Sequence, residues 1–415
     1  MTAPDTAPSP AASAPTFFSA GLVENPYPLY AMLRASNPVF KVPVPVPVGA
    51  GVFLLTRHQE VQPALRDARL SADRRKSDAV KLNAERLPRS LIGEDSVFRS
   101  MLVMDAPDHT RVRGLVNKAF TPRRVAALRP RIEAIAAELL DEPTRAQRME
   151  LMTDLAAPLP AIVIAELLGV PPADHPKFRS WAADIISAGN EIASGGDSRR
   201  SEAAFAALSD YLKQVIAARR RDPRDDMITG LVAAQEDRDA LTDTELVATA
   251  VLLLLAGHET TTNLIGNGTL ALLQHPAELA RLRAEPELLK SAIEEMLRFD
   301  SPVQGTARAA LEDVEYGGVP IAKGALILCG IGAANRDPAL FPEPDRFDIA
   351  RRDNHHLSFG FGAHFCLGAP LARLEGEIAF RALLERFPKL ALAEQKVEHR
   401  LNPILRGLKA LQVVG

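Results

Sequence analysis

A short segment near the C-terminal end of the chain contains the residue best suited to bind a metal. The segment Phe359–Gly368 reads FGFGAHFCLG, so Cys366 follows a stretch with two glycines. Glycine adopts backbone conformations that are closed to other residues, which lets a loop approach a flat ligand closely. The pattern after Pro370 predicts a helix, so the thiol lies at a helix start, where the dipole and free N–H groups stabilise a thiolate. A lone cysteine is usually a small buried hydrophobe, but the glycines, His364 and the helix start do not favour that alternative.

A second segment places polar residues inside an otherwise apolar helix. Thr242-x-x-Glu245 is a capping-box sequence, and the pattern after it predicts a helix that stops before Pro276. The middle of this helix, Leu252–Leu255, is apolar on every face and is therefore expected to be buried. The sequence GHETTT follows at residues 257–262, although glycine and threonine are poor helix formers. Two interpretations are open: a local distortion against a ligand, or a regular helix whose threonine hydroxyls bond back to the preceding turn.

The cysteine segment resembles the haem-binding loop of the cytochrome P-450 haem-thiolate monooxygenases. That loop reads F-x-x-G-x-x-x-C-x-G, and Phe359, Gly362, Cys366 and Gly368 match it in full. The resemblance implies that Cys366 is the axial thiolate ligand of haem b (iron protoporphyrin IX), whose electron donation favours O–O cleavage. It also implies a mainly α fold with small β-sheets, in which the long helix crosses one face of the haem.

Two further motifs, which precede the cysteine segment in the chain, extend the resemblance over nearly the whole chain. Glu295-Met-Leu-Arg298 fits the family's E-x-x-R motif, and the sequence PDRF at residues 344–347 fits its P-E-R-F element. The resemblance therefore implies that Glu295, Arg298 and Arg346 form the family's Glu–Arg–Arg network. We expect this network to be structural and to lie beneath the haem.

The polar part of the long helix resembles the family's oxygen-activating segment. The resemblance implies that Ala256 and Gly257 lie against the haem, with Gly257 leaving room for dioxygen. It assigns Glu259 and Thr260 as an acid–alcohol pair that delivers protons during oxygen activation. A hydroxyl positions the proton donors and a neighbouring carboxylate supplies them from solvent.

Haem propionates need cationic partners, and the resemblance points to four residues for this role. Residues at i and i+4 share one face of a helix, as the first two of these do. The four residues are His109, Arg113, Arg308 and His364.

These features predict a haem-thiolate monooxygenase that hydroxylates or epoxidises an apolar organic substrate with O2. The chain is similar to bacterial members of the family that act on secondary metabolites or fatty acids. The resemblance also implies that residues 77–99 and 187–198 close the substrate pocket. Two alternatives remain open: a peroxide-driven haem-thiolate peroxygenase or decarboxylase, and a haem sensor without turnover. Glu259 and Thr260 disfavour both, since peroxide-driven relatives lack this pair.

Composition restricts the partners of the protein. The chain has 49 Lys+Arg against 52 Asp+Glu, a net charge of -3, which gives no case for nucleic acid or an anionic membrane surface. Cys329 and Cys366 are the only cysteines, too few for a four-cysteine iron–sulfur cluster, and no G-x-G-x-x-G follows a predicted strand. Electrons are therefore expected from NAD(P)H through a separate ferredoxin reductase and ferredoxin. We expect the ferredoxin to dock on a cationic face with Arg111, Lys118 and Arg373.

The rest of the 415-residue sequence shows how these segments are positioned. We expect a disordered Pro/Ala-rich leader in residues 1–15 and one monooxygenase domain in residues 16–415. We expect the protein to be a monomer. The expected compartment is the cytoplasm, because neither a signal peptide nor a bilayer-spanning apolar stretch is visible.

Periodicity predicts several elements. Alternating Val and Pro over Lys41–Val48 predicts an extended edge segment beside a strand at Gly51–Leu55. Helical spacing is strong in three further segments, the first with a kink at Pro130. These are Arg123–Leu140, Ala203–Arg221 and Leu288–Phe299, and short strands are expected at Glu315–Ile321, Ala325–Leu328 and Ala410–Val414.

Overall fold

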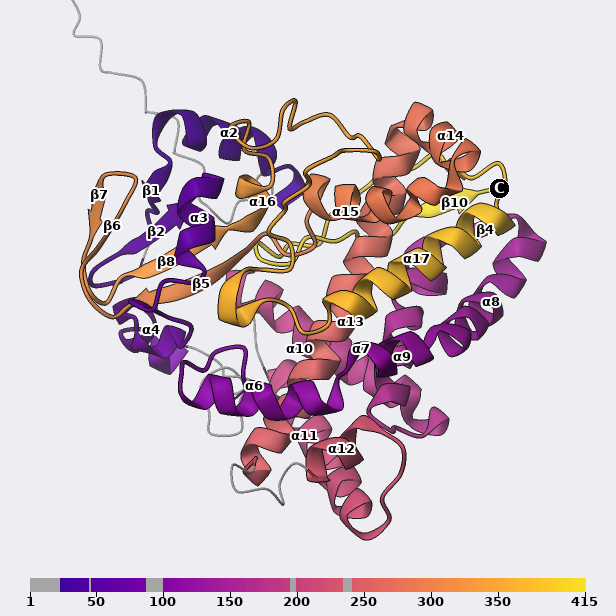
Figure 1. Cartoon of the computed structure of the whole chain (residues 1–415), viewed down its shortest axis with the longest axis horizontal. Helices are drawn as coiled ribbons and strands as arrows, with labels where there is room; N and C mark the ends of the chain where they lie inside the picture. The colour runs from indigo at the N-terminus through magenta and orange to yellow at the C-terminus, as the bar shows by residue number, and fades with distance from the viewer. Residues whose placement is uncertain (1–22, 45, 87–99, 195–198, 234–240) are drawn as a thin grey trace, which may run out of the picture.

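Helices make up most of the molecule, and a small sheet lies at one side of them (Figure 1). The computed structural model describes residues 23–44, 46–86, 100–194, 199–233 and 241–415. The expected leader in residues 1–15 lies outside these ranges, as do residues 87–99 and 195–198 of the expected pocket loops. The prediction of a mainly α fold with small β-sheets is confirmed.

Fifteen α-helices are present in the described residues, and short 3₁₀ turns connect several of them. The helices are α2 (Tyr27–Ser36), α3 (His58–Ala64), α4 (Asp78–Lys81), α6 (Asp108–Ala119), α7 (Pro122–Ala127), α8 (Arg129–Ala146), α9 (Pro158–Leu167), α10 (His175–Ser194), α11 (Arg199–Arg221), α12 (Met227–Ala233), α13 (Asp243–Gln274), α14 (Pro276–Ala284), α15 (Leu289–Phe299), α16 (Ile331–Ala334) and α17 (Ala369–Arg386). The short turns are η1 (Arg74–Lys76), η2 (Ala84–Arg86), η5 (Pro172–Asp174), η6 (Pro286–Leu288) and η7 (Gly362–His364), with a π-helical turn, η4, at Met152–Ala156.

The main sheet has five strands in the order β1-β2-β8-β5-β3, and only the β2–β8 pair is parallel. Its strands are β1 (Val39–Lys41), β2 (Val52–Leu55), β3 (Leu70–Ser71), β5 (Gly305–Ala310) and β8 (Leu326–Gly330). Strand β1 lies at the edge, next to the alternating Val–Pro residues, because proline cannot donate to a central ladder. Two smaller sheets are the hairpin β6 (Val314–Tyr316) and β7 (Val319–Ile321), and the set β4 (Arg148–Glu150), β10 (Gln412–Val414) and β9 (Ala391–Leu392).

Helix α13 runs through the middle of the molecule and spans 32 residues (Figure 1). The capping box at its start is present, with both reciprocal bonds between Thr242 and Glu245. Most of its apolar residues belong to one buried cluster with Ile164 of α9, Leu212 of α11 and Ile378 of α17, and others belong to a second cluster with Met296 of α15. Packing against these four helices therefore sets its position, as its apolar middle predicts.

The threonines of α13 do not interrupt it. The hydroxyls of Thr260, Thr262 and Thr269 donate to the carbonyls four residues earlier, at 2.7, 3.0 and 2.8 Å. The helix is continuous through these residues. Of the two interpretations left open by the sequence, the regular helix with back-bonded threonines is the one observed.

Arg123–Leu140, which Pro130 is expected at least to kink, is divided into two helices, α7 and α8, which meet at Leu128. Pro130 lies in the first turn of α8, where its missing N–H leaves no bond unmade. Residues 187–194, expected as part of a pocket loop, continue helix α10.

Among the helices of the described residues, none combines the length and apolarity needed to cross a membrane.

Candidate active site

The glycines before Cys366 let its loop fold tightly against the sheet side of the molecule. Gly360 and Gly362 have φ values of +72° and +74°, a region that favours glycine. A Cβ atom built on Gly362 would lie 2.9 Å from the Cβ of Arg66, so the site also has no room for a side chain. The Cys366 N–H donates to the Phe359 carbonyl at 2.8 Å, which closes the loop. Phe359, in turn, packs under the Arg373 guanidinium, 4.4 Å from its ring centre.

Cys366 lies just before helix α17, as predicted, and its sulfur accepts the N–H groups of Gly368 and Ala369. Burial raises the pKa of the Cys366 thiol, and these N–H groups and the charge of Arg113 only partly oppose the rise. The helix start alone therefore does not produce a thiolate. A metal cation bound to the sulfur deprotonates a thiol outright and supplies the missing charge.

The second cysteine has no such setting. Cys329 is fully buried in the middle of the main sheet, and burial raises its pKa to about 11. It is therefore a packing residue rather than a nucleophile or a ligand.

The four residues expected to bind propionates come together beside the cysteine loop. Arg113 donates to the carbonyl of Phe365 at 2.6 Å, and the rings of His109 and His364 are 4.1 Å apart. Arg308 is buried and within electrostatic reach of both histidines.

No carboxylate among the described residues pairs with the cations of this cluster, Arg113 and Arg308. Burial and the nearby cations lower the pKa of His109 and bring that of His364 to about 3. Arg308 bonds only to the Thr306 hydroxyl and the Ala307 carbonyl, and Nε2 of His109 has no partner among the described residues. Buried cations and donors without acceptors require an anion. The two carboxylates of haem fit this requirement, and the adjacent Cys366 sulfur fits its iron.

Sequence reasoning missed a fifth member of this cluster, Arg74 of η1. Its Nε atom is closed to solvent and has no partner among the described residues. Burial, followed by the charge of Arg308, lowers the pKa of Arg74 to about 10. In the sequence Arg74 is one of three consecutive cations, a pattern typical of an exposed turn, so no local signal identified it.

Helix α13 has one opening along its buried length. Between Leu246 and Leu272, only Leu255, Ala256, Gly257 and Thr260 are not buried. Ala256 and Thr260 are one turn apart on the same face, so they border the opening together. A Cβ atom on Gly257 would instead lie 3.4 Å from Ile164 of α9. That is an ordinary van der Waals contact, so packing does not require glycine at this position, and the role of Gly257 in leaving room for dioxygen stays a prediction.

Glu259 and Thr260 do not hydrogen-bond to each other. The Glu259 carboxylate is buried and accepts from Arg400 at 2.7 Å and from Asn263 at 3.3 Å, while Thr260 donates to the Ala256 carbonyl. Burial raises the pKa of Glu259, and Arg400 opposes this rise. Arg400, which the sequence did not identify, lies in the C-terminal segment. A Cβ atom on Gly407 of the same segment would be 1.9 Å from Oδ1 of Asn263, so glycine allows this close approach.

A second acid near the opening also lacked a sequence signal. Glu375 of α17 is 1 % exposed and is hydrogen-bonded to the Thr261 hydroxyl. Burial raises its pKa to about 8, so it holds a proton at neutral pH.

The Glu–Arg–Arg network differs from the prediction in its third side chain. Glu295 and Arg298 are fully buried and joined by two bonds of 2.7 and 2.8 Å. Arg351, not Arg346, completes the network, with its Nε 3.1 Å from Glu295. The Arg346 side chain is 55 % exposed and pairs with Glu343 and Asp348, and only its carbonyl accepts from Arg298.

The cationic face expected for a redox partner is largely neutralised within the chain. Arg111 is paired with Glu245, and Arg373 makes two bonds of 2.7 Å to Glu294. Lys118 is exposed on α6.

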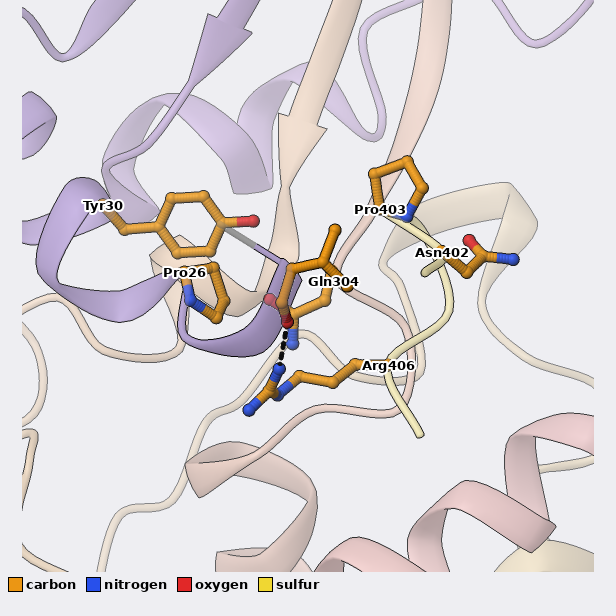
Figure 2. Close-up of a pocket in the computed structure, with 7 residues that line it drawn as sticks. Pro26, Tyr30, Gln304, Asn402, Pro403 and Arg406 are labelled. Atoms are coloured by element: carbon orange, nitrogen blue, oxygen red, sulfur yellow. Dashed lines mark hydrogen bonds between the residues drawn. The ribbon is translucent and has the colours of Figure 1, made fainter. Parts of the chain in front are cut away.

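A small cavity lies between helix α2, the start of the main sheet and the C-terminal segment (Figure 2). Its volume is about 20 Å³, room for water but not for an organic substrate. Arg406 borders it and donates to the Val23 carbonyl at 2.7 Å. The cavity is thus part of the polar packing that holds the N-terminal segment. It is lined by Val23, Pro26, Tyr30, Gln304, Asn402, Pro403 and Arg406.

Comparisons with known proteins agree with this geometry. The family model described as "Cytochrome P450" matches residues 90–413. The chain is 43 % identical to the polyketide biosynthesis cytochrome P450 PksS of Bacillus subtilis, over 94 % of this chain and 95 % of that protein. It is 42 % identical to 6-deoxyerythronolide B hydroxylase of Saccharopolyspora erythraea, over 93 % and 95 %. The solved structure of Bacillus subtilis PksS superposes with a TM-score of 0.87, at 41 % identity, covering 96 % of this chain and 98 % of that one.

Burial of Glu375 predicts a specific pH dependence of stability. Its pKa is raised in the folded state, so its contribution is fully present below the ordinary value of 4.5 and is lost as pH rises through about 8. The free energy of unfolding should therefore fall over this range in the wild type, and Glu375→Gln should flatten the slope. Denaturant titrations of the haem-loaded proteins from pH 5 to pH 9, roughly the range of this titration, measure it.

Glu377→Gln, on the same helix, is the matched control. Burial opposes but does not overcome the bond to Arg129 that lowers the pKa of Glu377, so this variant should keep the wild-type slope above pH 5, roughly one unit above the ordinary carboxyl pKa. Equal slopes in wild type and Glu375→Gln would show that Glu375 does not titrate as described.

The altered network predicts different costs for two arginines. Arg351→Met removes a cation from a carboxylate that water cannot reach, and should lower the free energy of unfolding by about 3 kcal/mol. Arg346→Met removes only exposed ion pairs, so it should change stability little. Thermal melting followed through haem absorbance compares the two, and a larger loss in the Arg346 variant would contradict the network seen here.

Proposed function

The chain belongs to the cytochrome P450 family, and on that premise we propose a role for each side chain that the fold gathers at the active site. The enzyme is a haem-thiolate monooxygenase with haem b as its cofactor, and it uses O2 and electrons from a redox partner. The observation that carries the proposed roles is the Cys366 sulfur, which accepts the N–H groups of Gly368 and Ala369 and lies near Arg113. Arg113 and Arg308 are two cations without a carboxylate partner among the described residues. That residues 16–415 form one domain, and that the protein is a cytoplasmic monomer, stay predictions from the sequence.

Cys366 is the ligand of the haem iron in this proposal. Its N–H bonds from Gly368 and Ala369 orient the sulfur and reduce its electron density, which tunes a bound metal. His109, Arg113, Arg308 and His364 hold the propionates. Phe359 and Gly362 shape the loop, and Gly368 leaves room beside the sulfur, since a Cβ atom there would lie 3.9 Å from it.

Haem b, when bound, supplies the iron that activates O2, and the protein supplies protons and a dry opening. Thr260 borders the opening, and its hydroxyl must leave the Ala256 carbonyl to present a proton there. Glu259 holds the next proton. Its carboxylate is bound by Arg400, whose side chain is 31 % exposed and therefore connects the buried acid to solvent. Because Glu259 and Thr260 do not touch, transfer between them requires rotation of Glu259 or a bridging water.

The opening suits a large apolar substrate. Leu401 and Ile404, next to Arg400 in the sequence, are each 48 % exposed, which is unusual for large apolar side chains. We infer that they contact the substrate. The names of the relatives PksS and 6-deoxyerythronolide B hydroxylase suggest a polyketide-type secondary metabolite.

A ferredoxin and its reductase are the proposed source of electrons. The internal pairing of Arg111 and Arg373 leaves less net charge on the expected docking face than the sequence suggests. Steering of an acidic partner should therefore be modest.

The two alternatives are separated from this proposal by product analysis. A monooxygenase forms oxygenated product with O2, NAD(P)H and redox partners, a peroxygenase does so with peroxide alone, and a sensor does neither. Retention of both Glu259 and Thr260 at the opening supports the first outcome.

The ligand assignment is tested by Cys366→His. The ferrous–CO complex of the wild type should show the absorption typical of a thiolate ligand, and the variant should lose it. Cys329→Ala is the matched control and should keep it, because Cys329 is buried in the sheet. An unchanged thiolate spectrum in Cys366→His would overturn the assignment.

The role of Thr260 is tested by Thr260→Ala. Substrate should still bind and NAD(P)H should still be consumed, but the yield of oxygenated product per NAD(P)H should fall by up to about 100-fold as peroxide is released instead. Thr269→Ala is the control, since Thr269 makes the same bond within α13 but is fully buried. Full coupling in Thr260→Ala would move proton delivery to another group.

A further inference from the structure

Three consecutive cations in η1 have different surroundings. Arg75 is bound to Asp73 at 2.8 Å, and Lys76 to Asp105 at 2.7 Å. Arg74, the first of the three, differs from them: its Nε is closed to solvent and has no hydrogen-bond partner among the described residues. The same turn therefore pairs two cations with carboxylates and leaves the third half-buried without one among the described residues.

Arg308, a second cation, lies within electrostatic reach of Arg74. Arg308 is 5 % exposed and has no carboxylate partner in the described part of the chain. Two guanidinium groups in a poorly hydrated site repel each other, and their burial is stable only when an anion lies between or beside them.

The protein offers no such anion among the described residues around the pair. Asp105 is the acid within electrostatic reach of His109 and His364, but its oxygens already accept from Ser71, Ala72 and Lys76. The other titratable groups shown within electrostatic reach of Arg308 are His109, His364, Arg74 and Cys329, and none of them is a carboxylate.

We propose that Arg74 and Arg308 form a carboxylate-binding pair, and that the carboxylate is one propionate of the haem. The proposal rests on the proposed haem site and adds Arg74 to it. The planar fork of N–H donors on a guanidinium matches the two oxygens of a carboxylate, and the two groups carry opposite charges. The position favours a propionate over a substrate acid, because Arg308 reaches His364, two residues from the proposed iron ligand. Arg74 would thereby connect η1 to the cofactor. Helix α4, which follows η1, is the first helix of residues 77–99, the segment expected to close the substrate pocket.

The test measures haem loss from the holoenzyme to excess apomyoglobin. Arg74→Leu should release haem roughly 10- to 100-fold faster than wild type, the range for losing a hydrogen bond to a charged group. Arg74→Lys should restore much of the retention because it keeps the charge. Arg75→Leu is the matched control and should match wild type, since Arg75 is occupied by Asp73.

A second arm identifies the carboxylate. The same proteins are loaded with iron protoporphyrin IX dimethyl ester, which lacks the propionate charges. If Arg74 binds a propionate, wild type and Arg74→Leu should lose this ester at equal rates.

A third arm titrates myristic acid and its methyl ester against the ferric spectrum. A preference for the acid that disappears in Arg74→Leu, with haem loss unchanged, would keep the carboxylate pair and place an organic acid in it.

Two results would overturn the proposal. One is haem and fatty-acid binding that are both unaffected by Arg74→Leu. The other is equal acceleration of haem and dimethyl ester loss, which would indicate a purely structural role. Failure of the haem site itself is seen separately, because the thiolate spectrum of the CO complex depends on Cys366 and should survive in every Arg74 variant.

Discussion

An ionisable sulfur buried at the start of α17 is the constraint on which the rest of the structure depends. Burial alone favours the neutral thiol, and the two N–H groups of the helix start do not reverse this. A bound metal cation would favour the thiolate and oppose the effect of burial. The tight turn at Gly360 and Gly362 and the anion-seeking cluster beside it are arranged around that requirement.

The same cost of burying charge separates structural from ligand-binding arginines. Arg298 and Arg351 share the carboxylate of Glu295 and also donate to backbone carbonyls, so each has an anionic partner within the protein. Arg308 is buried and Arg74 half-buried, and neither has a carboxylate partner among the described residues. A protein can keep such a pair only by binding an anion, which makes missing compensation a sign of a ligand site.

Helix α13 combines a packing role with a chemical one. Its length and apolar faces hold it between α9, α11 and α17, and the back-bonded threonines keep it regular. Chemistry is confined to the short opening at Ala256 and Thr260. Two buried acids belong to the helix or contact it next to Thr260: Glu259 is held by Arg400, and Glu375 is hydrogen-bonded to Thr261. They differ in their partners, because Arg400 opposes the rise in the pKa of Glu259 and no cation among the described residues does so for Glu375.

The sequence by itself determined the features that are local along the chain. The Phe359–Gly368 loop, the capping box at Thr242 and the helix face shared by His109 and Arg113 each depend on residues within about ten positions, so spacing alone predicts them. Tertiary structure decided the partners. Arg400 reaches Glu259 across 141 positions, and Arg351 replaces Arg346 because only one of the two side chains lies inside. Burial and pairing at such separations depend on how the elements pack, and no local pattern of residue types encodes that.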